Sequence, residues 1–530
     1  MKLKYIIPSA LIASMGMSSC VNDLDVTPID PSKVMVADAN GLFNKCFGNM
    51  ATAGNGGADG DCDVDGLDGG TTGFVRQMWN ANELTTDESI CAWGDPGIPE
   101  FNLNQWTAAH PMLKGFYNRL TTGISYCNHY LSECSAVDAT MTAEIRFVRA
   151  FYYFQLMDCF GNVPFATELP SDNAPQAKRS EVFSFVESEL LECLNDMAEP
   201  RTNKYGRADK AAAWMLLARI YLNAEVYTGT AQWDKAAEYA KKVMESGYKV
   251  FDNGGNYEGA SGWSAYQMLF MGNNGENGAQ VEAILPILQD GTETTSWGTT
   301  LFLMASTFKA DMTLVGTATN GTSEAWGGNR ARPELIAKFF PNGDAPQADV
   351  WEMIDKAGDD RALFWGKDRS LDITNTTEFT EGYSVCKFTN FYSDGSSPKD
   401  PQFPDADFFM MRAAEANLTY AEALTRQNGG VAPQEALDAL NALRTRAHAT
   451  KKASYTLAEI CDEWCREFYY EGRRRSDLIR FGYFGGNNSY KWQWKGGVKA
   501  GANFDEHLNI FAIPDDDMNA NSNLVQNPGY

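Results

Sequence analysis

The sequence has few of the residues on which metal and nucleophile chemistry depend. Only four of its 530 residues are histidines, and no two of them stand at a metal-ligand spacing. It contains neither a Cys-x-x-Cys pair nor the Gly-x-Ser-x-Gly segment that carries the nucleophile of α/β hydrolases. Metal catalysis and hydrolase-fold chemistry are therefore disfavoured, although residue counts alone leave a Ser-His-Asp site open.

Positive charge is also scarce. The chain has 44 Lys and Arg against 69 Asp and Glu, a net charge of −25. Nucleic acids and anionic membrane surfaces repel such a chain, so we expect no nucleic-acid partner and favour neutral or cationic ligands, or a basic protein surface. The hydrophobic fraction of 44% supports a large core, and 13 tryptophans provide aromatic surface for stacking.

Apolar runs long enough to cross a bilayer are absent after residue 20. Residues 1–20 instead predict a signal peptide, in which Lys2 and Lys4 precede a short apolar run over 5–17. The run ends in Met-Ser-Ser-Cys, which resembles a bacterial lipobox and predicts lipidation at Cys20. An ordinary secretory signal is the alternative. Export would permit disulfides among the other cysteines, but their pairing cannot be deduced from the sequence.

A helical hairpin over residues 205–247 organises the rest of the chain. Its first helix has the pattern Trp-x-x-Leu-Ala-x-x-Tyr from Trp214 to Tyr221, and an alanine-rich second helix follows Trp233. An apolar stripe follows the helical period: Ala213, Leu216, Leu217, Ile220, Tyr221 and Ala224. This pattern is typical of tetratricopeptide repeats, whose helix pairs bury their faces by stacking on others.

Helical patterns of this kind extend over about 105–250 and 408–481, and an irregular stretch separates them. Residues 251–404 are rich in Gly, Asn, Thr and Ser and predict loops with short strands. No linker divides the chain, so we expect one mainly α-helical domain over 21–530. Long excursions from a rigid scaffold often carry the binding function.

Three tryptophans stand beside turn residues and are candidates for stacking on sugar rings. Trp93 precedes a Gly-Asp-Pro-Gly turn, and Trp297 and Trp326 are each followed by glycine. The segment from Arg76 to Asp95 adds guanidinium, amide and carboxylate groups suited to paired hydrogen bonds with hydroxyls. The alternative is that Trp79 and Trp93 only seal this segment onto the helices, which we favour for Trp79 and leave open for Trp93.

Two acidic stretches suggest other sites but have simpler explanations. The start of a calcium loop, Asp61-x-Asp63-x-Asp65-Gly66, is followed by Thr72 where an EF-hand requires a bidentate acid, so 52–73 predicts a flexible, solvated loop. The charged residues over 457–481 resemble a catalytic carboxylate cluster. Interlocking ion pairs along a helix broken at Gly472 explain them better.

Several motifs, in order, resemble the SusD/RagB-like outer-membrane lipoproteins over nearly the whole chain. Besides the lipobox at Cys20, they are Arg149–Tyr153 through Phe165, Tyr205–Arg207, Ala213–Leu222, Tyr420–Ala423, Leu440–Ala447, Glu471–Arg474, Asp477–Arg480 and Gln526–Tyr530. The resemblance implies four tetratricopeptide-like hairpins supporting an excursion that builds the ligand site.

The resemblance also implies a role without catalysis. Such proteins lie on the cell surface over a TonB-dependent, SusC-like transporter and capture oligosaccharides for import. The segment from Gly66 to Asp95 resembles the starch-binding type, which makes Arg76, Trp93 and Asp95, with Trp297 and Trp326, the expected glycan contacts. No cofactor is expected. A structural calcium is compatible with the family, but we assign it no residues. Another glycan, a peptide cargo, an adhesin and, less favoured, a glycoside hydrolase remain as alternatives.

Overall fold

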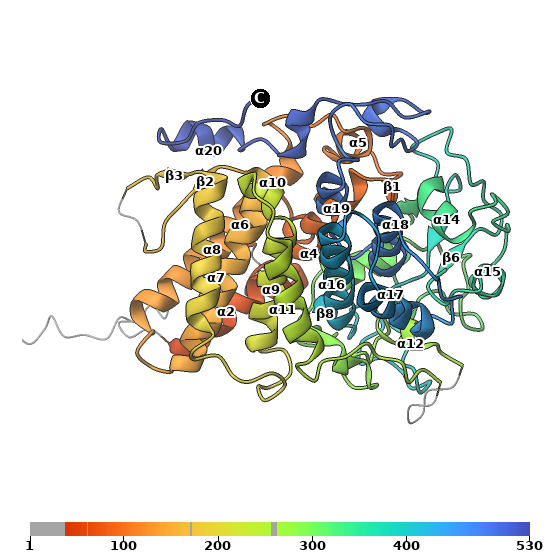
Figure 1. Cartoon of the computed structure of the whole chain (residues 1–530), viewed down its shortest axis with the longest axis horizontal. Coiled ribbons are helices and arrows are strands. Elements are labelled where there is room, and N and C mark those ends of the chain that lie inside the picture. The colour runs from red at the N-terminus through yellow and green to blue at the C-terminus, as the bar shows by residue number, and fades with distance from the viewer. Residues whose placement is uncertain (1–37, 61, 170–171, 256–261) are drawn as a thin grey trace, which may run out of the picture.

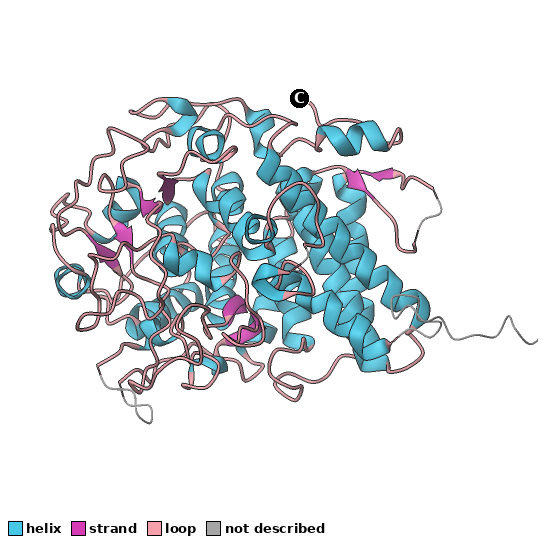
Figure 2. Ribbon diagram, turned by 180° about the vertical axis from the view of Figure 1, so that it is seen from behind, coloured by secondary structure: helices cyan, strands magenta, loops and turns pink. Residues whose placement is uncertain are grey.

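A computed structural model describes residues 38–60, 62–169, 172–255 and 262–530. The described chain is mainly helical, as expected, with a few short strands (Figure 2). Its strands form four antiparallel pairs: β1 (Ser89–Cys91) with β5 (Asn329–Ala331), β2 (Val163–Pro164) with β3 (Gln176–Ala177), β4 (Ala283–Ile287) with β8 (Phe408–Arg412) and β6 (Phe364–Trp365) with β7 (Ser384–Val385). No helix among these residues is both long and apolar enough to cross a membrane.

The predicted hairpin over 205–247 is present. Helix α9 (Lys210–Leu222) packs against α11 (Trp233–Met244), and a short helix, α10 (Ala224–Thr228), occupies the turn between them. The carboxylate of Asp209 caps α9 by accepting the amide of Ala211 at 2.9 Å. Ala236 and Ala240 of α11 are fully buried, and their small side chains allow the helices to approach closely.

Further helices extend this hairpin on both sides into a continuous row (Figure 1). Four precede it: α2 (Ala39–Ala51), α6 (Pro111–Glu133), α7 (Ala139–Phe160) and α8 (Arg179–Cys193). Four follow it: α16 (Ala413–Gln427), α17 (Gln434–Arg446), α18 (Leu457–Phe468) and α19 (Arg474–Arg480). We call residues 251–404, which separate the two groups of helices in the sequence, the excursion. Because α11 packs directly on α16, the row of helices is continuous in space although the excursion interrupts it in the sequence.

The excursion leaves and rejoins the row at one place. Strand β4 (Ala283–Ile287) pairs with β8 (Phe408–Arg412), which leads directly into α16. Between them lie the short strands β5 (Asn329–Ala331), β6 (Phe364–Trp365) and β7 (Ser384–Val385). The excursion also holds short helices that the sequence did not reveal: α12 (Ala265–Met268), α13 (Thr300–Ala305), α14 (Pro333–Phe339) and α15 (Val350–Ala357). Each is too short to show a clear helical period.

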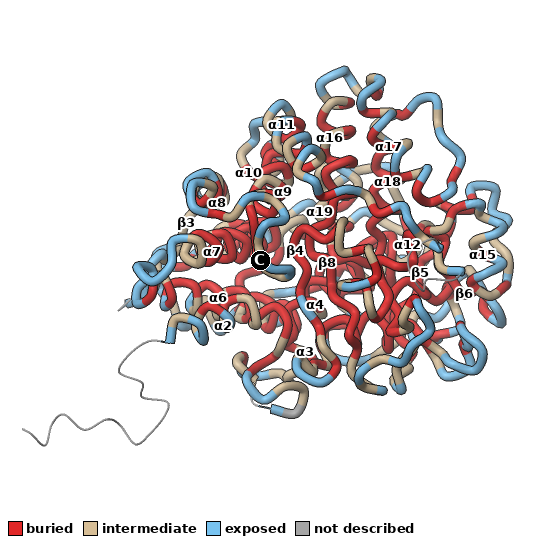
Figure 3. The backbone as a smooth tube through the Cα atoms, turned by 90° about the horizontal axis from the view of Figure 1, so that it is seen from below, coloured by how far each residue is buried: buried red, intermediate tan, exposed pale blue. Residues whose placement is uncertain are grey.

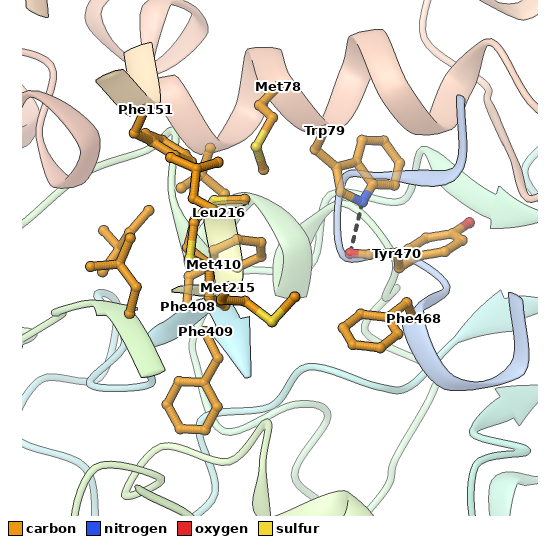
Figure 4. Packing of buried hydrophobic residues seen from close by; sticks show 14 of the residues in the cluster. Met78, Trp79, Phe151, Met215, Leu216, Phe408, Phe409, Met410, Phe468 and Tyr470 are labelled. Carbon is orange, nitrogen blue, oxygen red and sulfur yellow. Dashed lines mark hydrogen bonds between the residues drawn. The ribbon is translucent and has the colours of Figure 1, made fainter. Parts of the chain in front are cut away.

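The core is continuous from the helical row into the excursion. In Figure 4, side chains from α4 (Phe74–Trp79), α7, α9, β8 and α18 meet in one cluster. Trp79 is fully buried there, and its indole N–H donates to the carbonyl of Tyr470 at 3.1 Å. The structural role favoured for Trp79 is therefore confirmed. The buried backbone in Figure 3 likewise runs through both parts of the chain.

The charged residues over 457–481 form ion pairs, as predicted, but most of their partners come from other elements rather than from the same helix. Glu467 of α18 is fully buried and accepts hydrogen bonds from Arg361 of the excursion, Arg412 of β8 and Arg446 of α17. Arg412 also pairs with Glu471 at 2.8 Å. Because Glu467 and Glu471 meet guanidinium groups from other elements, the network ties the excursion to the helical row.

Candidate functional site

The structure brings Arg76 and Trp93, which precede the excursion in the sequence, together with Trp297 and Trp326 of the excursion. The ring centroid of Trp326 lies 6.3 Å from that of Trp93 and 6.2 Å from that of Trp297. Successive rings are tilted by 51° and 42°. All three are half-buried, so each retains surface accessible to solvent. We call these three rings the tryptophan arc.

Trp93 is fixed by a strand pair and two glycines. It follows β1 (Ser89–Cys91), which pairs with β5, and its indole N–H donates to the carbonyl of Gly327 at 2.9 Å. Its ring lies directly against Gly328, because a Cβ there would come within 2.3 Å of the indole. No residue with a side chain could occupy position 328 without displacing the ring.

The other two rings of the arc are fixed by different means. The indole N–H of Trp326 donates to Oε2 of Glu324 at 2.7 Å, and its backbone amide donates to the carbonyl of Ala305. The ring of Trp297 packs at 5.0 Å, edge to face, against Phe403. The arc is therefore held in place before any ligand arrives.

Arg76 lies beside Trp93, and its guanidinium N–H groups have no hydrogen-bond acceptor among the described residues. Its guanidinium is 4.9 Å from the ring centroid of Phe302 and 5.8 Å from that of Trp93. The Nε atom of this guanidinium is buried without a partner in the described part of the chain. Burial lowers the pKa of Arg76, although the carboxylates of Asp68 and Asp95 act against that shift. Unused guanidinium donors beside aromatic rings are suited to binding hydroxyl groups.

Asp95 stands at the edge of the site. It is exposed, two residues beyond Trp93 in the sequence, and its negative charge acts to raise the pKa of Arg76. Its neighbour Pro96 is exposed too and offers no side-chain amide. The carboxylate of Asp95 could accept a hydrogen bond from a hydroxyl group.

Sequence reasoning missed the residues that hold the rings. Phe302 and Phe403 had no feature that marked them, and Gly328 was marked only as a turn glycine after Trp326, because their contacts arise from partners far away in the sequence. Glu324 could have been noticed as an acid two residues before Trp326. It also accepts the side-chain amide of Gln402 at 2.8 Å, which joins two loops of the excursion.

The acidic stretch over 52–73 is more ordered than predicted. Asp63 pairs with Lys45 at 2.8 Å, and the buried guanidinium of Arg119 donates to the carbonyls of Ala53 and Thr72. Because the carboxylate of Asp63 is neutralised by a lysine, it is a poor calcium ligand, and Asp61 lies outside the described residues. Over the described ranges, no three His, Cys, Asp or Glu residues are grouped to hold a metal. A structural calcium therefore remains an unassigned prediction.

Comparisons with known proteins agree with this architecture. Residues 337–530 match the model of the SusD family, and residues 30–222 match a model described as "Starch-binding associating with outer membrane". The chain is 40% identical, over 573 aligned positions and the full length of both proteins, to the "Starch-binding protein SusD" of Bacteroides thetaiotaomicron. The chain belongs to the SusD family.

Solved SusD-like structures share the fold at lower identity. A SusD homologue from Bacteroides thetaiotaomicron has a TM-score of 0.67 at 18% identity and covers 96% of this chain and 100% of its own. Surface glycan-binding protein A from Bacteroides fluxus has a TM-score of 0.65 at 18% identity, with 93% and 100% covered. A "Laminarin binding SusD-like protein" has a TM-score of 0.64 at 21% identity, with 93% and 99% covered.

The two matched regions of this SusD-family chain leave out residues 223–336. That gap contains Trp297 and Trp326, two of the three rings of the arc. Arg76, Trp93 and Asp95 lie in the region matched over 30–222, so the candidate site is divided between a matched and an unmatched part of the chain.

Proposed function

We propose that this protein is a non-catalytic glycan-binding lipoprotein of the cell surface that captures a starch-like α-glucan. The observation that carries the proposal is the tryptophan arc, with the unused donors of Arg76 beside it. The 40% identity to a starch-binding relative supports it, as do the solved relatives named for laminarin and surface glycan binding.

The shape of the arc favours a curved glucan. Its rings turn by 51° and then 42°, so successive stacked sugars would also have to turn. A flat, extended polysaccharide would instead require nearly coplanar rings. Each stacked ring contributes roughly 1 kcal/mol beyond its buried area, and three such contacts give the modest affinity that suits capture and release.

Binding without chemistry is the role that the relatives support. They are named for what they bind, and the buried carboxylates that resembled a catalytic cluster are paired with arginines. Another glycan or a peptide cargo in the same site remains the main alternative, because a fold does not fix its ligand.

Anchoring and delivery complete the proposal. Lipidation at Cys20 would hold the protein at the outer membrane, and a TonB-dependent, SusC-like transporter would receive the glycan. The family description "associating with outer membrane" supports the location. The lipidation site and signal peptide lie outside the described residues, and the transporter follows from the family resemblance.

A glycan panel tests the proposal. The protein lacking residues 1–20 would be titrated with maltooligosaccharides, starch, laminarin, xylan, levan and pectin. Binding of maltooligosaccharides without release of reducing ends is expected. Binding only of another polysaccharide would retain capture and reject starch, and release of reducing ends would reject the non-catalytic role.

A further inference from the structure

A second group of aromatic side chains lies on the surface of the excursion, outside the arc. The ring centroid of Trp263 is 5.7 Å from that of Trp351, with a tilt of 51°, and 6.3 Å from that of Phe391, with a tilt of 22°. These spacings match those of the arc. We call Trp263, Trp351 and Phe391 the second aromatic platform.

The second aromatic platform is open to solvent. Trp351 is 41% exposed, and it is the most exposed tryptophan of the described chain. Trp263 and Phe391 are half-buried. Helix α15, which lies at the rim of the molecule in Figures 1 and 3, buries Val350 and Met353 in the core and leaves Trp351 exposed. The core contacts of α15 therefore do not require a tryptophan at this position.

The backbone around Phe391 is fixed. The amide of Gly272 donates to the carbonyl of Phe391 at 2.9 Å, and the amide of Asn390 donates to the carbonyl of Asn320 at 2.7 Å. A Cβ at Gly321 would lie 2.6 Å from the amide nitrogen of Phe391, so two loops cross in direct contact. The indole N–H of Trp351 donates to the carbonyl of Leu314 at 3.4 Å. The platform thus resembles the arc in being preformed.

One short segment joins the platform to the arc. Gly321 touches Phe391, and Trp326 is the central ring of the arc. Five residues, even fully extended, span at most about 18 Å. The platform and the arc are therefore close enough for one polymer chain to reach from one to the other.

The charge around the platform favours a neutral occupant. Asp349, Glu352 and Asp355 lie on or beside α15 with only Lys356 as a nearby cation in the sequence. An anionic ligand would be repelled, and the net charge of −25 adds to that effect. A neutral polymer of hydroxyl-bearing rings can stack without that penalty.

We propose that Trp263, Trp351 and Phe391 form a second glycan-binding site, which holds the same polysaccharide chain that the arc binds. This inference rests on the proposed function of the arc. The arc alone would bind short oligosaccharides, and the platform would add contacts only for chains long enough to reach it, which raises the apparent affinity for polymer.

Titrations with a short and a long ligand test the second site. Trp351→Ala is the variant, because the residue is exposed and alanine is a good helix former. Leu191→Ala, at a residue of α8 that is 40% exposed, is the matched control. Trp351→Ala is expected to weaken starch polymer binding roughly fivefold and to leave maltotriose binding unchanged. Leu191→Ala should change neither.

Other outcomes separate the two proposals. Unchanged polymer binding in Trp351→Ala and in the Trp263→Ala, Trp351→Ala double variant would overturn the second site while the arc stands. Loss of co-purification with the transporter, without loss of polymer binding, would overturn it in favour of a protein contact. If the unmodified protein binds no glycan in the panel, the proposed function itself fails.

Discussion

The glycine at position 328 shows how one missing side chain can set a binding surface. The indole of Trp93 rests on this glycine, and the adjacent carbonyl of Gly327 accepts the indole N–H. The tryptophan was recognised in the sequence because a turn follows it. Gly328 was noticed only as a turn glycine after Trp326, because its contact with Trp93 joins two distant segments of the sequence.

Gly328→Ala should therefore weaken glycan binding almost as much as Trp93→Ala. The added methyl group would push the ring out of the arc, and loss of one stacked sugar costs about 1 kcal/mol, or roughly fivefold in Kd. Calorimetric titration measures the effect. The control is Gly48→Ala in α2, where an added Cβ meets nothing within 4 Å. Wild-type affinity in Gly328→Ala would show that Trp93 makes no contact with the glycan.

Helices of the row depend on small residues where they approach one another. Ala240 of α11 is fully buried, and α11 packs against both α9 and α16. The row was predictable from the sequence because long amphipathic helices repeat a clear period. The short helices α12 to α15 were not, since their positions depend on tertiary contacts rather than on local pattern.

Ala240→Leu should destabilise the protein by about 1–3 kcal/mol through overpacking between these helices. Denaturant unfolding followed by circular dichroism measures the change. Lys241→Leu, at the exposed next position, adds a leucine to the same helix and should stay within about 0.5 kcal/mol of the wild type. Equal stability of the two variants would contradict the close packing of α11.

The ion pairs of Glu463 in α18 predict that the free energy of unfolding depends on pH. Burial alone would raise the pKa of Glu463, but Arg361, Arg466 and Arg444 outweigh it and lower the pKa to about 2. Their guanidinium nitrogens lie 2.8, 2.9 and 3.0 Å from its carboxylate oxygens. Because the folded pKa lies below the unfolded value, this stabilisation is complete above the unfolded pKa and is lost as the pH falls towards 2.

Unfolding free energies measured between pH 5 and 2 should therefore fall, with Glu463 alone contributing about 3 kcal/mol. Glu463→Gln should be less stable at neutral pH, since it leaves guanidinium groups unpaired, and should lose this part of the slope. Glu238→Gln, at an exposed side chain of α11, should retain the wild-type slope. A Glu463→Gln slope identical to that of the wild type would contradict the account of this cluster.

The whole molecule combines a helical row with a binding excursion whose two ends meet in the β4–β8 pair. The sequence located both parts, and four of the five predicted site residues cluster around the arc. It could not show that the ring of Trp326 lies between those of Trp93 and Trp297, nor that Trp263 and Trp351 form a separate surface. Those arrangements depend on loop packing, which has no periodic signal in the sequence.

Anchoring is tested on the whole cell. If the protein is anchored through a lipid on Cys20, as proposed, Cys20→Ser should abolish lipid labelling and release the protein from the outer-membrane fraction, since no helix in the described part of the chain is long and apolar enough to cross a membrane. Fractionation with metabolic lipid labelling measures this. A variant that remains unlabelled but membrane-bound would indicate anchoring through a partner protein instead.

The central claim is that the tryptophan arc binds the glycan, and its middle ring tests this most directly. Trp326 contacts both other rings, so Trp326→Ala interrupts the arc at its centre. Calorimetric titration with maltoheptaose should show a loss of affinity of roughly tenfold or more. The control is Trp214→Ala, at a half-buried tryptophan of α9. Wild-type affinity in Trp326→Ala, with the fold intact, would contradict the account.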